Sequence, residues 1–286
     1  MRLPAPLHIR SVAFIAPAAF IAVVGATVPG PPTVGRTPDG TSRVDSIPVT
    51  PLPPREGMYH PFRPGERLTY EAHVGLFGDV GEGVLEILAD SIRGTPVYNL
   101  RLGLRASALF GAITVDDLFQ SWLDPRTMRA LRFEKRQDEP KTHDDQAFDF
   151  DIENMTWRRV GEGTDGSVET GPLPTDHPLD EISFIYYVRA LPLDVGDHYV
   201  LNDYFKESGN PLVLDVVRRE RVKVPAGTFQ TIVVRPTIRT KGLFGQGGEA
   251  ELYFTDDALH VLVMLKSRLP VLRTLEFRLK SFKMGY

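Results

Sequence analysis

The architecture of this chain can be inferred from residues 66–74, Glu66-Arg67-Leu68-Thr69-Tyr70-Glu71-Ala72-His73-Val74, in which apolar and polar side chains alternate imperfectly. A period of two is typical of a β-strand that buries one face. Turn-forming residues 75–83 follow, and the alternation returns in Val84-Leu85-Glu86-Ile87-Leu88-Ala89-Asp90. The two segments therefore predict a β-hairpin.

Outward from this hairpin, strand-like segments continue to the end of the chain. Further strands are expected at residues 97–106, 119–123, 130–136, 146–151, 155–160, 198–206, 211–224, 229–239, 249–255, 261–269 and 273–282. Many short strands joined by turns imply an antiparallel meander. We predict a mainly β fold: a large curved antiparallel sheet that forms a barrel, a half-barrel or a sandwich.

One segment departs from this pattern. In residues 179–191 the apolar side chains recur at helical spacing, for example at Ile182, Ile185 and Tyr186. Asp180 is placed to cap the first turn, and Pro192 closes the segment. We expect one substantial helix here.

The first 57 residues differ from the rest in composition. Residues 1–26 carry basic residues before a short apolar run and end in Val24-Gly25-Ala26, which predicts a cleaved signal peptide. The run is shorter than the roughly 20 residues that span a bilayer, so a retained anchor is the less favoured alternative. Residues 27–57 are rich in proline and predict a disordered spacer. Residues 58–286 then form a single β-rich domain of an exported protein of the periplasm or cell envelope, with no transmembrane span after cleavage.

Composition excludes several classes of function. The chain of 286 residues has a formal net charge of −4, and its basic residues do not cluster, so no nucleic-acid partner is expected. It contains no cysteine, which excludes a disulfide scaffold, a thiolate zinc site and a thiol nucleophile. The histidines are scattered without a metal-binding spacing. We therefore assign no metal ligand, no cofactor and no catalytic residue.

Five motifs occur in order along the folded region. They are Pro64-Gly65-Glu66-Arg67-Leu68-Thr69-Tyr70, Gly81-Glu82-Gly83, Asp180-Glu181-Ile182-Ser183-Phe184-Ile185-Tyr186-Tyr187-Val188-Arg189, Val224-Pro225-Ala226-Gly227-Thr228-Phe229 and Tyr253-Phe254-Thr255-Asp256-Asp257. In this order they resemble an uncharacterised exported bacterial family, domain of unknown function 3108 (DUF3108), over residues 59–282. The resemblance implies an exported β-rich domain, and it implies no activity.

The favoured function is a non-enzymatic envelope domain for binding, carriage or scaffolding. A curved sheet closed by one helix is expected to leave an apolar concavity for a lipid or another apolar envelope ligand. The residues expected to line it are Phe119, Trp122, Phe184, Tyr187 and Phe205. The alternative for all five is ordinary core packing.

A second candidate surface is the glycine-rich loop at residues 241–248. Leu243 and Phe244 lie at its expected tip, where apolar side chains are unusual. A flexible hairpin loop is the favoured interpretation of this stretch, and if these side chains are buried they only fill the loop. The alternative hypothesis is that they contact an envelope protein partner or a lipid.

The rival function is a hydrolase that acts on envelope polysaccharide through carboxylates such as Asp116, Asp117 or Asp256. Neighbouring residues on a strand face opposite sides of the sheet, so the acidic pairs in this sequence are expected to be structural. Two carboxylates that converge in a cleft would favour the hydrolase, and an apolar pocket without ionisable groups would favour carriage. A third option, a structural assembly partner, predicts only a flat apolar patch.

Overall fold

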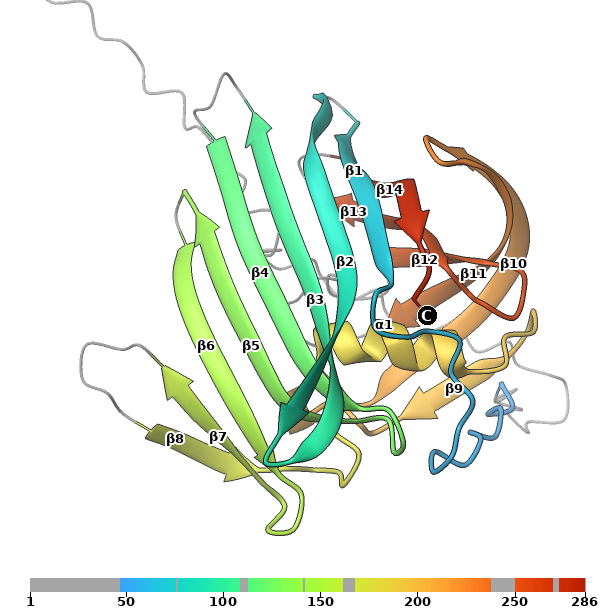
Figure 1. Cartoon of the computed structure of the whole chain (residues 1–286). Coiled ribbons are helices and arrows are strands. Elements are labelled where there is room, and N and C mark those ends of the chain that lie inside the picture. The colour runs from blue at the N-terminus through green and yellow to red at the C-terminus, as the bar shows by residue number, and fades with distance from the viewer. Residues whose placement is uncertain are drawn as a thin grey trace, which may run out of the picture.

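The computed structural model of the chain describes residues 47–75, 77–108, 113–140, 142–161, 168–237, 250–269 and 273–285. Within these residues, fourteen strands form one antiparallel sheet that curves as a half-barrel around a helix (Figure 1). The strands are β1 (Arg67–Val74), β2 (Gly78–Ile92), β3 (Thr95–Ala108), β4 (Ile113–Asp124), β5 (Arg129–Glu139), β6 (Thr142–Asp151), β7 (Thr156–Gly161), β8 (Val168–Pro172), β9 (His198–Leu201), β10 (Leu212–Val224), β11 (Gly227–Thr237), β12 (Ala250–Thr255), β13 (Leu262–Leu269) and β14 (Arg273–Lys283). The predicted fold class is confirmed.

The strand order explains how one chain builds so large a sheet. Strands β1 to β8 lie side by side in the order of the sequence, and so do strands β9 to β14. The two halves join where β14 pairs with β1, for example at Leu68↔Phe282. Strands β8 and β9 are the two ends of this order, so the sheet is open rather than closed into a barrel.

Helix α1 (Glu181–Ala190) connects the two halves and confirms the predicted helix. The Asp180 side chain accepts hydrogen bonds from the backbone N–H groups of Ile182 and Ser183, and the Ser183 side chain bonds back to the Asp180 backbone. This reciprocal capping box satisfies backbone donors that would otherwise lack partners in a buried first turn. Ser121 of β4 also donates to the Asp180 carboxylate at 2.6 Å, which fixes the helix start against the sheet.

The sheet has two unlike faces. The inner face, against which α1 packs, carries alternate residues of each strand, and the outer face carries the residues between them. On β1 the buried inner-face residues are Leu68, Tyr70, Ala72 and Val74. On β1 this alternation buries one face and leaves the other partly exposed, as the period of two predicts.

The described end of the expected spacer contacts the folded domain. The Thr50 backbone N–H donates to the carbonyl of His198 on β9 at 2.7 Å. Arg55 forms an ion pair with Asp203, and its guanidinium lies 4.3 Å from the centroid of the Tyr187 ring. Residues 47–57 are therefore attached to the domain. This differs from the sequence-based prediction that the spacer is disordered as far as residue 57. Residues 1–46, with the expected signal peptide 1–26, lie outside the described residues.

Among the residues that the structure describes, none forms a helix long and apolar enough to cross a bilayer.

Candidate functional site

The inner face changes character along strands β5 and β6. Beside α1 it is apolar: Phe133 of β5 and Phe148 of β6 are buried, and they oppose each other. Beyond them the inner-face positions become polar, and Lys135 opposes Gln146. Gln137 and Glu139 on β5 and Asp144 on β6 continue this polar strip. Charged side chains are not expected on a sheet face that only covers an apolar core, because burying them costs free energy.

Across the half-barrel from the polar strip on β5 and β6, the inner face is apolar. The side chains of Leu104 and Phe277 meet over Gly83, where an added Cβ would lie 3.3 Å from the first and 3.2 Å from the second. Val74, Val115 and Leu275 are also buried in this region. Leu104, Val115, Leu275 and Phe277 keep 4–7 % of their surface accessible. The inner face beyond α1 is therefore amphipathic.

Lys206 is the most unusual cation on this face. It follows β9, and its ammonium lies over three aromatic rings, 4.4 Å from the centroid of Phe148, 5.2 Å from Phe205 and 5.9 Å from Trp157. Aromatic faces attract cations because of their negative quadrupole. The side chain is partly buried, so its charge is partly removed from water.

The strand register brings two further cations to the same region. Arg159 on β7 opposes Phe148, and Lys135 on β5 opposes Gln146, two residues along β6. Residues opposite each other on one face of a sheet are close neighbours. We call Lys135, Arg159 and Lys206 the basic patch. Its residues are partly exposed, so solvent reaches this part of the inner face.

The three cations differ in their partners. Lys135 forms an ion pair with Asp144 at 3.3 Å. Arg159 forms one with Glu169, also at 3.3 Å, but its Nε is a buried donor that has no acceptor among the described residues. Among the described residues, no carboxylate lies within ion-pair distance of Lys206. The patch therefore holds hydrogen-bond donors that the described residues do not use.

Electrostatics connect the three side chains. Burial lowers the pKa of the Lys206 ammonium, and the carboxylate of Glu181 opposes this change. The positive charges of Arg159 and Lys135 add to the lowering of the Lys206 pKa. An anion bound here would relieve the repulsion among the three cations.

Gly171 leaves room for one of the aromatic rings that Lys206 contacts. Trp157 on β7 opposes Gly171 on β8, and its indole lies over the glycine. A Cβ on Gly171 would lie 2.6 Å from Cε2 of the indole, closer than van der Waals contact allows. The glycine therefore permits the position of the ring that Lys206 contacts.

Two carboxyl groups meet on the inner face at the end of the polar strip. Asp117 on β4 and Glu139 on β5 are buried, and their side chains influence each other electrostatically. The backbone N–H of Asp138 donates to Asp117 at 3.0 Å. Burial raises the pKa of Glu139 to about 7, and the Asp117 carboxylate adds to this rise.

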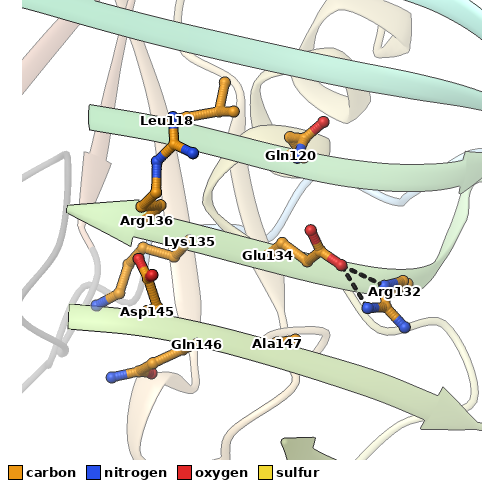
Figure 2. A pocket seen from close by; sticks show the side chains of 9 residues that line it. All are labelled: Leu118, Gln120, Arg132, Glu134, Lys135, Arg136, Asp145, Gln146 and Ala147. Atoms are coloured by element: carbon orange, nitrogen blue, oxygen red, sulfur yellow. Dashed lines mark hydrogen bonds and ion pairs between the residues drawn. The ribbon is translucent and has the colours of Figure 1, made fainter. Parts of the chain in front are cut away.

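The outer face carries two described hollows. One, of about 320 Å³, lies over β4, β5 and β6; Figure 2 shows the ion pair between Arg132 and Glu134 there, with Gln120 on one neighbouring strand and Ala147 on the other. The second, of about 670 Å³, adjoins the β2–β3 and β6–β7 turns and also contacts Arg132. Arg132 donates to Asp149 at 2.7 Å as well. Because this arginine is already paired, the outer hollows are weaker candidates than the basic patch.

The structure separates the five residues expected to line a concavity. Phe119 opposes Lys135 on the inner face, and Phe205 contacts Lys206, so these two adjoin the basic patch. Phe184 and Tyr187 are buried on α1. Trp122 lies on the outer face, where its indole N–H donates to Asp90 at 2.8 Å. Leu243 and Phe244 lie outside the described residues.

The carboxylates of the rival function are also dispersed. Asp116 is on the outer face beside Arg105, and Asp256 forms an ion pair with Arg219 at 2.9 Å. Asp117 meets Glu139, which sequence reasoning did not single out. Within the described part of the chain, no group of three His, Asp or Glu side chains is arranged to hold a metal ion.

The basic patch was missed from the sequence, although a signal was present. Counting every second residue from the apolar Phe133 gives Lys135, Gln137 and Glu139, so polar residues occupy expected core positions on β5. The same count back from Phe148 gives Gln146. Lys206 had no such signal, because it follows a strand end.

Comparisons with known proteins found one matching family and several similar solved structures. The family model described as protein of unknown function (DUF3108) matches residues 69–278. Among curated proteins, none matches this chain. A solved structure of a β-barrel-like protein of domain of unknown function DUF1849 from Brucella abortus is similar, with 11% identity, a TM-score of 0.47 and coverage of 77% of this chain and 97% of that chain. A protein with a YmcC-like fold from Bacteroides fragilis shows 10% identity and a TM-score of 0.27 over 79% and 99% of the two chains.

Proposed function

The chain belongs to the family of proteins of unknown function DUF3108, and on the geometry of its inner face we propose that it is an exported, non-enzymatic binding domain of the bacterial envelope. Its ligand is an amphiphile, held on the inner face of the half-barrel beyond α1. The predicted signal peptide supports the compartment.

The amphipathic inner face carries this proposal. On one side, Leu104 and Phe277 pack together over Gly83, and on the other side the basic patch faces the same interior. Binding sites for small molecules combine an apolar lining with a few placed polar groups that orient the ligand. An amphiphile matches both sides, whereas a scaffold without a ligand requires neither.

Intrinsic fluorescence can test the proposal directly. The chain has two tryptophans, so a Trp122→Phe variant leaves Trp157, beside the basic patch, as the sole indole. We expect its emission to shift in a saturable way when dodecyl amphiphiles are added below their micelle concentrations. A matched Trp157→Phe variant reports from the outer face through Trp122 and should respond less.

A second measurement identifies the natural occupant. Native mass spectrometry of protein purified from a bacterial envelope, followed by lipid extraction, should recover an acyl compound in stoichiometric amount. Protein that is reproducibly empty and also silent towards every dodecyl probe would refute the binding function and favour an assembly role.

A further inference from the structure

We infer that Lys206, together with Arg159, binds the anionic headgroup of the amphiphile, a carboxylate or a phosphate on an alkyl chain. This inference rests on the proposed function and specifies the chemical class of its ligand. It assigns the headgroup to the basic patch and the alkyl chain to the apolar side of the inner face.

Lys206 has no counterion at ion-pair distance among the residues that the structure describes. A partly buried ammonium loses hydration, and proteins normally compensate this loss with a carboxylate. Glu181 attracts Lys206 electrostatically, but it lies beyond ion-pair distance, and one of its oxygens accepts from the Tyr204 hydroxyl at 3.0 Å. The rings under Lys206 offset only part of the cost. A ligand anion would supply the remaining partner.

Arg159 is the second cation of this site. Within the described part of the chain its Nε is a buried N–H donor without an acceptor, although its terminal nitrogen is paired with Glu169. A buried donor that lacks a partner costs free energy, and such groups in folded proteins are rare enough to require an explanation. Arg159 opposes Phe148, the ring nearest to Lys206. One anion between the two cations would satisfy both.

Three aromatic rings form the surface beneath Lys206. Phe148 and Phe205 have ring centroids 5.1 Å apart, and Trp157 lies 5.8 Å from Phe148. These rings exclude water from one side of the headgroup position, which strengthens a charge-assisted hydrogen bond. They also offer an apolar surface to the first methylene groups of a chain. Inorganic anions would lack this contact.

The experiment compares headgroups on one alkyl chain. In the Trp122→Phe background, dodecanoate, dodecyl phosphate and the neutral dodecyl maltoside are titrated below their micelle concentrations, with Trp157 emission as the readout. We expect at least one of the two anions to bind about tenfold or more tightly than the maltoside, because a charge-assisted hydrogen bond contributes on this scale. The tighter of the two anions identifies the headgroup.

Two lysine variants then locate the charge. Lys206→Met keeps the aliphatic stem over the rings but removes the ammonium, and it should reduce anion binding to the level of the maltoside. Lys280→Met makes the same change of net charge on the outer face, where Lys280 pairs with Glu82, and should leave anion binding unchanged. Urea unfolding of each variant shows that the fold is retained.

The outcomes separate the two proposals. If all three amphiphiles bind alike, or if Lys206→Met binds the anions like its parent, the anion site is refuted while the binding function stands. If none of the three binds, the binding function itself fails. If the anions lose affinity in Lys280→Met as much as in Lys206→Met, general charge attraction explains the preference and the site is again refuted.

Discussion

Arg189 and Glu66 form a bidentate ion pair in which neither side chain reaches solvent. The two terminal nitrogens of Arg189 on α1 donate to the two carboxylate oxygens of Glu66 at 2.5 and 2.9 Å. The guanidinium also lies 5.3 Å from the centroid of Phe62. Glu66 immediately precedes β1, so this contact joins the end of the helix to the strand at which the two halves of the sheet meet.

Breaking this pair from one side should be strongly destabilising. Arg189→Met leaves the Glu66 carboxylate buried without its partner, and we expect it to lower the free energy of unfolding by roughly 3–5 kcal/mol. The double variant Glu66→Leu/Arg189→Met leaves no buried charge and should recover most of this loss. Urea denaturation measures both. A single variant that costs less than about 1 kcal/mol would show that water or another group replaces the arginine.

The capping box of α1 gives a second stability prediction. Asp180→Ala removes the acceptor for two backbone N–H groups and for Ser121, and should cost about 2 kcal/mol. Asp180→Asn keeps a side-chain oxygen in place and should cost much less at neutral pH. Thermal unfolding monitored by circular dichroism compares the two. Equal losses would mean that the charge, rather than the acceptor, holds the helix start.

The sequence was sufficient for the helix and for most strands because their signals are local. Asp180 and Pro192 delimit α1 within a residue or two, and alternation places β1 and β2. The strand expected at residues 198–206 instead ends at Leu201. Beyond it, Tyr204 exchanges two hydrogen bonds with the side chain of Asn210, a contact that no periodicity reveals.

The candidate site was harder to predict from the sequence than the helix and the strands. The physical reason differs from residue to residue. Phe119 and Trp122 are three positions apart on one strand, so alternation alone places them on opposite faces. The two side chains therefore do not line the same face of the sheet. Lys206 is different, because its three rings come from β6, β7 and the residue before it. Such a cluster depends on the curvature of the whole sheet.

The close contact between Trp157 and Gly171 predicts a sharp effect of one methyl group. Gly171→Ala would place Cβ against the indole and force Trp157 to move, because the neighbouring atoms of the strand are fixed. We expect a loss of roughly 1–3 kcal/mol and a shift of Trp157 emission in the Trp122→Phe background. Gly103→Ala on β3 is the control, since a Cβ there meets nothing within 4 Å. If both variants behave alike, the indole does not require the glycine.

The buried carboxyl groups predict how stability depends on pH. Burial raises the pKa of Glu139 from 4.5 to about 7 and that of Asp180 from 3.8 to about 7. In this interval the folded state binds more protons than the unfolded state, so the free energy of unfolding must fall as pH rises towards 7. Thermal unfolding should therefore show a lower Tm at about pH 8 than at about pH 5, by a few degrees.

Substitution assigns this slope to particular groups. Glu139→Gln removes one titrating group while keeping a donor for Asp117, so it should flatten the dependence of Tm on pH and raise Tm on the alkaline side relative to the parent. Glu82→Gln is the control, because the hydrogen bond from Lys280 lowers the pKa of Glu82 and its titration lies below this interval. A Glu139→Gln slope equal to that of the parent would mean that Glu139 is already ionised in the folded state.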